Sequence, residues 1–154
     1  FFQAEDGIRD VAPSVGSEMC IRDRDIVIPA AEKRGYKPDN CVTSDHLPGG
    51  RPHPYMIYQN MIDLGIPSVD AVIKCGDTIA DIKEGVNAKV TSVGIILGSN
   101  ELGLTENEVK SLSPEELKTR MGEVRRRMLE AGANAVLDSI TDLPAYIEQI
   151  STEN

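Results

Sequence analysis

The sequence predicts an α/β fold built on a Rossmann-like parallel sheet. Short apolar runs alternate with amphipathic stretches about ten residues long, which is the pattern of strands and helices in βαβ units. A chain of 154 residues also favours one domain of this kind rather than two. Ligands of such sheets bind outside the carboxyl ends of the strands. The loops that follow the predicted strands are therefore where we expect the chemistry.

Composition excludes several classes of protein. The chain has 16 Lys and Arg against 25 Asp and Glu, a net charge of −9, which argues against nucleic-acid binding because that needs clustered basic charge. No apolar run approaches the roughly 20 residues that cross a membrane. Cys20, Cys41 and Cys75 are too widely spaced for a zinc knuckle. We expect them to be reduced thiols of a cytoplasmic chain.

Residues 1–24 are not expected to belong to the domain. They show no sustained helical or strand period and no apolar core of a signal peptide. Gly7-Ile8-Arg9-Asp10 nearly repeats as Cys20-Ile21-Arg22-Asp23, and the segment resembles translated sequencing-adapter sequence. We therefore interpret residues 1–24 as non-native, with a genuine disordered extension as the alternative. The domain then comprises residues 25–154.

The first predicted elements flank a loop rich in glycine and proline. Residues 25–34 are predicted as a helix that ends at Gly35, a usual helix stop. Residues 40–43 are a short strand candidate, and residues 44–52 form the loop. Residues 54–64 are predicted as a helix because a proline is favourable in its first turn.

The remaining elements continue the alternation of strand and helix. Two runs are apolar enough for buried strands, and Ser113-Pro114-Glu115-Glu116 is a capping-box pattern that can start a new helix. The predicted elements are, in order, a strand at 69–75, a helix at 78–87, a strand at 91–97, a loop at 98–103, one or two helices over 105–131, a strand at 134–137 and a helix at 143–150.

Two carboxylates follow the predicted strand at 69–75. Asp77 would lie at the carboxyl edge of the sheet, and Asp81, one turn into the next helix, could face the same cavity. Neighbouring carboxylates repel each other unless a cation lies between them, and Mg²⁺ prefers such oxygen ligands. A bound Mg²⁺ would neutralise and orient a phosphate. The alternative is local: Asp77 or Thr78 caps the helix, and Asp81 interacts with the helix dipole.

Arg51 is a second candidate because it lies in the glycine-rich loop just before a predicted helix. A guanidinium suits phosphate or carboxylate oxygens, and the helix N-terminus adds partial positive charge. A solvated surface arginine is the alternative. The loop over 98–103 could border a pocket or be a plain connection, and Arg125, Arg126 and Arg127 are expected to lie on a helix surface.

Together these residues resemble the second half of a hydrolase of the haloacid dehalogenase superfamily. The strand followed by Gly76-Asp77-Thr78-Xaa-Xaa-Asp81 is similar to the acidic motif of that superfamily. More narrowly, residues 25–154 resemble the phosphonoacetaldehyde hydrolases, or phosphonatases. The stretches that carry this narrower resemblance are Gly35-Tyr36-Lys37-Pro38-Asp39, Gly50-Arg51-Pro52-His53-Pro54, the run from Ile73 to Asp81 and the run from Ile96 to Glu106.

The resemblance implies cleavage of the carbon–phosphorus bond of phosphonoacetaldehyde, a small-molecule phosphonate, to acetaldehyde and phosphate. In that family a cap-domain lysine forms a Schiff base with the aldehyde, an aspartate attacks phosphorus, and Mg²⁺ steadies the phosphoryl group. By resemblance, Asp77 would bind Mg²⁺ and Asp81 would help to hold the water shell of the metal. Arg51 would contact the phosphoryl group or the carboxylate of the nucleophile.

The chain departs from the family pattern in two respects. It contains no Asp-Xaa-Xaa-Gly-Thr-Thr nucleophile motif, and Lys33, Lys37 and Lys74 do not match the Schiff-base lysine. We therefore expect the C-terminal half of the core without a cap domain, inactive by itself and with an apolar sheet edge left open.

The resemblance also implies a homodimer formed largely through the cap, so this chain would lack the main dimer surface. The alternatives are a fragment of another phosphatase or phosphomutase of the superfamily, or a binding module without catalysis.

Overall fold

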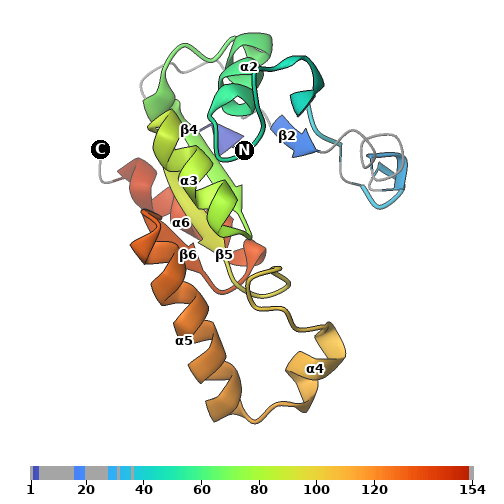
Figure 1. The fold of residues 1–154 in the computed structure, drawn as a ribbon, viewed down its shortest axis with the longest axis vertical. Helices are drawn as coiled ribbons and strands as arrows, with labels where there is room; N and C mark the ends of the chain where they lie inside the picture. The colour runs from blue at the N-terminus through green and yellow to red at the C-terminus, as the bar shows by residue number, and fades with distance from the viewer. Residues whose placement is uncertain (1, 4–15, 20–27, 31, 36, 153–154) are drawn as a thin grey trace.

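A sheet with helices on both faces forms the centre of the chain (Figure 1). The computed structural model describes residues 2–3, 16–19, 28–30, 32–35 and 37–152. The order of the strands is β1-β4-β5-β6, and β4, β5 and β6 are parallel to one another, which confirms the predicted α/β class. The strands of this sheet are β1 (Phe2–Gln3), β4 (Val72–Gly76), β5 (Thr91–Ile95) and β6 (Ala135–Leu137). A separate parallel pair joins β2 (Gly16–Met19) to β3 (Asn40–Thr43).

The helices form a layer on each side of the sheet. On one face, α3 and α5 pack around Ile82, Val124 and Met128. On the other face, α6 packs its Leu143 against Ile73 and other strand residues. The helices are α2 (Tyr55–Leu64), α3 (Ile79–Ala88), α4 (Glu106–Ser111), α5 (Pro114–Glu130) and α6 (Leu143–Thr152), with 3₁₀ turns at Ser44–His46, Val69–Ala71 and Ile140–Asp142.

The inner strands alternate the faces to which their side chains point. In β4, Ile73 joins the apolar cluster under α6, whereas Val72 joins the cluster formed with α2 and the end of α3. Lys74 shares the α3 face with Val72 because strand residues two apart point the same way. The strand therefore delivers one basic side chain into the layer between the sheet and α3.

Hydroxyl residues fix where three helices begin. Thr78, Thr105 and Ser113 are the N-caps of α3, α4 and α5, and each forms a capping box with the acidic residue three positions later. The predicted restart at Ser113 is thus confirmed, and the stretch predicted to hold one or two helices holds two.

Several element ends differ from the predicted ones. The strand predicted at 69–75 starts three residues later because Val69–Ala71 form a 3₁₀ turn that Ser68 caps. The strand predicted at 91–97 ends at Ile95. Of the helix predicted over 25–34, residues 28–30 and 32 are helical, residues 25–27 and 31 lie outside the described residues, and Gly35 adopts φ 89°.

Residues 2–3 and 16–19, within the segment that we interpret as non-native, form two short strands. Phe2 and Gln3 pair antiparallel with Ile73 and Val72, and residues 16–19 pair with β3. The predicted open edge of the sheet is where β1 lies, because a strand edge presents backbone groups that any extended segment can pair with. The other residues of 1–24 lie outside the described part of the chain.

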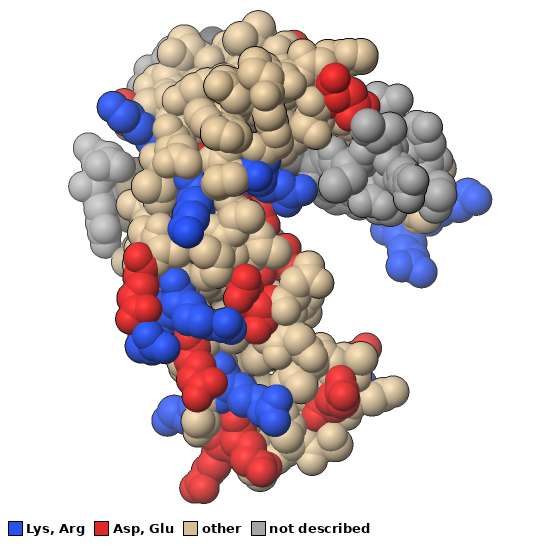
Figure 2. Space-filling model, in the orientation of Figure 1, with Lys and Arg blue, Asp and Glu red and all other residues tan. Residues whose placement is uncertain are grey.

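Charged side chains of both signs are interspersed over α5 and its surroundings, as Figure 2 shows. The three arginines that we expected on a helix surface each contact an acidic side chain: Arg125 contacts Asp138, Arg126 contacts Glu130, and Arg127 contacts Glu101. None of the helices in the described ranges is long and apolar enough to cross a membrane.

Candidate functional site

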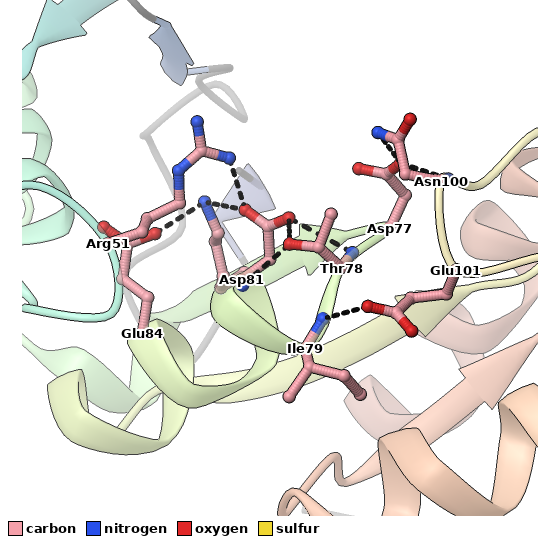
Figure 3. A network of polar contacts seen from close by, with 9 residues as sticks. Arg51, Asp77, Thr78, Ile79, Asp81, Glu84, Asn100 and Glu101 are labelled. Carbon is pink, nitrogen blue, oxygen red and sulfur yellow. Dashed lines mark hydrogen bonds and ion pairs between the residues drawn. The ribbon is translucent and has the colours of Figure 1, made fainter. Parts of the chain in front are cut away.

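Asp81 lies at the junction where β4 ends and α3 begins (Figure 3). Its side chain is buried, with the residue only 2% exposed. One carboxylate oxygen, Oδ2, accepts hydrogen bonds from the backbone N–H of Thr78 at 3.2 Å and from the Thr78 hydroxyl at 2.5 Å. The other, Oδ1, accepts from Arg51 Nη1 at 2.7 Å. Asp81 therefore both completes the capping box of α3 and forms an ion pair with Arg51.

The charge of Asp81 is stabilised by its neighbours. Burial by itself would raise the pKa of this carboxyl, but the Lys74 ammonium, the Thr78 hydroxyl and the Arg51 guanidinium outweigh burial. The pKa of Asp81 consequently lies below its ordinary value. The carboxylate is thus ionised at neutral pH despite being buried.

Arg51 reaches this junction from the loop before α2. The peptide bond between Arg51 and Pro52 is cis, and the Arg51 side chain is 29% exposed where it meets Asp81. The structure thus brings together two of the three predicted site residues, which lie 30 positions apart in the chain. Arg51 is not a solvated surface arginine, which was the alternative.

Asp77 is held by a different loop. Its Oδ2 accepts hydrogen bonds from the backbone N–H and the side-chain Nδ2 of Asn100, both at 2.9 Å. In Figure 3 the Asp77 side chain points toward Asn100, and the Asp81 side chain points toward Arg51. The two carboxylates therefore turn to different partners, since the start of α3 already engages Asp81. The local alternative is present as well, because Thr78 is the N-cap.

The donor set suits Mg²⁺ in part. Among the described residues, no group of three or more His, Cys, Asp or Glu side chains could hold a metal ion. Mg²⁺ nevertheless needs only one or two carboxylates, because it keeps several waters and binds substrate phosphates. Asp77 fits as a direct ligand. Asp81 does not fit as a direct ligand, because Arg51 and Thr78 already donate hydrogen bonds to its two carboxylate oxygens. It fits as a residue that contacts the water molecules around the metal.

Sequence reasoning missed a buried ion pair next to these residues. Lys74 Nζ lies 3.0 Å from Glu84 Oε2 and 3.5 Å from Asp81 Oδ1. Lys74 is 5% exposed and Glu84 is fully buried. A signal was present: Lys74 interrupts an apolar strand, and Glu84 follows Asp81 by three positions, which places both acids on one helix face.

Two glycines allow α3 to approach the sheet at this point. A Cβ at Gly76 would lie 2.1 Å from Asp81 Cβ, and a Cβ at Gly85 would lie 2.7 Å from Ser92 Oγ and 3.3 Å from Lys74 Cβ. Any side chain at these positions would push α3 away from β4 and β5. The glycines therefore set the short spacing across which Lys74 meets the acids of α3.

The loop over residues 98–103 borders the site. Besides the contacts of Asn100, Glu101 Oε1 accepts a hydrogen bond at 3.2 Å from the backbone N–H of Ile79, at the start of α3. Arg127 of α5 lies 3.3 Å from the other carboxylate oxygen of Glu101. These contacts place the loop beside Asp77 and the start of α3.

Comparison with known proteins identifies the relatives of this chain. No family model matches it. A protein of Parabacteroides distasonis named phosphonoacetaldehyde hydrolase is 62% identical over 130 residues, which cover 84% of this chain and 49% of that protein. Proteins of the same name from Bacteroides fragilis and Bacillus cytotoxicus are 54% and 48% identical over 129 residues. Over this stretch, the chain is similar to proteins named phosphonoacetaldehyde hydrolase. The narrower of the resemblances predicted from the sequence is thereby confirmed.

A solved structure supports the same conclusion. The phosphonoacetaldehyde hydrolase-like protein from Oleispira antarctica superposes with a TM-score of 0.86 at 30% identity. The match covers 91% of this chain and 51% of that protein. The chain thus spans about half the length of the curated relatives and of the solved structure.

Proposed function

We propose that this chain is part of a Mg²⁺-dependent hydrolase that cleaves the carbon–phosphorus bond of phosphonoacetaldehyde to acetaldehyde and phosphate. The observation that carries the proposal is the contact between Arg51 and Asp81 at the carboxyl end of β4. This is the edge at which α/β sheets bind their ligands. The names of the homologues supply the reaction, and the proposal includes a small-molecule phosphonate as partner and a cytoplasmic location.

Arg51 would bind the phosphoryl group. One of its nitrogens donates to Asp81, which anchors the guanidinium at that atom, and the side chain remains 29% exposed at the strand edge. A planar guanidinium offers five N–H donors in a fixed arrangement. Such anchoring suits the recognition of phosphoryl or carboxylate oxygens.

Asp77 and Asp81 would divide the work at the metal site. Asp77, half-buried at the strand edge, would be the protein ligand, with Asn100 fixing its carboxylate. Asp81 would not touch the metal directly. It would contact the water molecules around the metal and hold the Arg51 guanidinium. When bound, Mg²⁺ would neutralise the charge of the phosphoryl oxygens and orient them.

The proposal assigns neither the nucleophile nor the Schiff-base amine to this chain. The sequence contains no Asp-Xaa-Xaa-Gly-Thr-Thr motif. Lys74 is buried beside Asp81 and Glu84, so its amine is not presented to a substrate. We therefore propose that the chain supplies residues for metal and phosphoryl binding and does not turn over phosphonoacetaldehyde by itself.

Binding and turnover test this proposal separately. We expect the chain to bind inorganic phosphate in the presence of Mg²⁺ by isothermal titration calorimetry. Arg51→Met and Asp77→Asn should each weaken that binding at least tenfold. The matched control is Arg126→Met, which removes an arginine whose acidic partner, Glu130, lies on the exposed face of the same helix. An assay that couples acetaldehyde to its reduction should detect no turnover.

Two results would contradict the proposal. Equal phosphate affinity in the wild-type chain and in Arg51→Met would remove Arg51 from the site. Turnover by the purified chain would show that it contains a nucleophile of its own.

A further inference from the structure

Four charged side chains meet beneath the start of α3. Arg51 and Lys74 carry the positive charges, and Asp81 and Glu84 carry the negative ones. Figure 3 labels Arg51, Asp81 and Glu84. Lys74, Asp81 and Glu84 are at most 5% exposed. Burial of charged groups is costly, and apolar residues of similar volume often serve stability equally well. The proposed roles of Arg51 and Asp81 leave Lys74 and Glu84 unexplained.

The geometry places Lys74 where it acts on Asp81. Its ammonium lies between the two acids of α3, 3.0 Å from Glu84 Oε2 and 3.5 Å from Asp81 Oδ1. That same Oδ1 accepts the hydrogen bond from Arg51 at 2.7 Å. The Asp81 carboxylate is therefore held from three sides, by Thr78 at Oδ2 and by two cations at Oδ1.

Glu84 in turn holds Lys74. A lysine side chain has a flexible stem of four carbons, and the ion pair with the fully buried Glu84 fixes where this stem ends. A Cβ added at Gly85 would lie 3.3 Å from Lys74 Cβ, so the backbone of α3 passes close to the start of the Lys74 side chain. Glu84 thus positions Lys74, Lys74 contacts Asp81, and Asp81 contacts Arg51.

We propose that Lys74, held by Glu84, is a positioning residue that fixes the Asp81 carboxylate and, through it, the Arg51 guanidinium that binds the phosphoryl group. The proposal rests on the proposed function only for the last step, the binding of the phosphoryl group. The competing explanation is that Lys74 and Glu84 merely balance each other's charge inside the fold.

A double variant separates these explanations. Lys74→Met alone leaves two buried acids against one arginine, so a loss of folding would say nothing about positioning. Lys74→Met/Glu84→Gln removes one charge of each sign and keeps Arg51 and Asp81. If the pair only balances charge, the double variant should behave as the wild-type chain does. If Lys74 positions Asp81, the double variant should fold but hold Arg51 loosely.

The guanidinium of Arg51 gives a direct readout. In ¹⁵N spectra of the full chain, with the signals assigned by their loss in Arg51→Met, we expect slow rotation and separate Nη signals. In the double variant these signals should merge, and the affinity for inorganic phosphate with Mg²⁺ should fall about tenfold, as is usual for supporting residues of metal sites. The matched control, Arg126→Met/Glu130→Gln, makes similar changes at an exposed pair and should alter neither readout.

Each outcome is decisive. Unchanged Arg51 signals and affinity in the double variant would overturn the positioning role and leave a charge-balancing pair. The Arg51 signals could also merge in the double variant while the wild-type chain binds neither Mg²⁺ nor phosphate. That result would support the positioning role and refute the proposed function. If the double variant does not fold, Glu84→Gln replaces it. That variant should loosen Lys74 and broaden the Arg51 signals, and unchanged signals there would overturn the proposal.

Discussion

Replacement of Gly76 by alanine should disturb the site strongly, although it adds only one methyl group. The added Cβ would lie 2.1 Å from Asp81 Cβ and 2.6 Å from Asp81 Cγ. Carbon atoms in contact are normally about 3.5–4.0 Å apart, so the start of α3 would have to retreat by about 1.4 Å. The Asp81 Cβ is attached directly to the backbone, so no side-chain rotation relieves the clash.

The cost follows from that displacement. Overpacking of a well-packed interior costs about 1–3 kcal/mol, and sometimes more. Here the retreat of α3 also strains the contacts of Asp81 with Thr78 and Arg51. We therefore expect a loss of about 3 kcal/mol, at the upper end of that range. For a chain of about 150 residues this corresponds to a fall of roughly 6–12 °C in Tm.

The assay is thermal and urea unfolding of Gly76→Ala beside a matched control. Gly122→Ala makes the same chemical change inside α5, where an added Cβ has no heavy atom within 4 Å. It should stabilise the chain by about 0.5–1 kcal/mol, because alanine is the better helix former. A Gly76→Ala chain as stable as the wild type, with phosphate binding unchanged, would refute the close packing of α3 on β4.

Two further predictions concern pH and a helix start. Because the pKa of Asp81 is lower in the folded chain than its ordinary value of 3.8, its ionised form stabilises the fold above pH 3.8, and this contribution is lost as pH falls through the folded-state value. Urea unfolding between pH 3 and 7 should therefore show the advantage of the wild type over Asp81→Asn shrinking at the acid end, and a constant difference would contradict the shift. Ser113→Ala should lower the free energy of unfolding by about 1 kcal/mol, because Ser113 caps α5. Urea unfolding measures this loss against Ser151→Ala, a change at an exposed position near the C-terminal end of α6. Equal stability of the two variants would show that the cap contributes nothing.

The elements of the domain were predictable because their signals are local. Periodicity located β4, α3, β5 and α5, and the capping box at Ser113 divided the long helical stretch correctly. Predicted ends failed where a short local contact replaced the expected element, as with the 3₁₀ turn that Ser68 starts before β4. The pairing of β1 with β4 was not predictable, since two residues carry no period and an open strand edge accepts many sequences.

The sequence predicted which polar residues lie near the site, but not which of them contact one another. Arg51, Asp77 and Asp81 were selected because each follows a strand or precedes a helix. Which side chains meet depends on tertiary packing. The sequence does not reveal that Asn100 holds Asp77. The signal at Lys74 and Glu84 indicates buried charges on one face, but it does not show that Lys74 contacts both acids of α3. The close approach of α3 to the sheet at Gly85, which brings Lys74 near the acids of α3, likewise cannot be inferred before the helix is placed on the sheet.

The capping boxes carry a consequence for the order of folding. Each joins residues three positions apart, so each can close at little cost in loop entropy while the rest of the chain is still extended. The parallel pairing of Ile73 with Thr91, and of Val93 with Ala135, must instead wait for an intervening helix to form and cross over. Contacts that are distant along the chain form more slowly. In a refolding experiment, protection of the amides at the starts of α3 and α5 should therefore precede protection of the amides of β5.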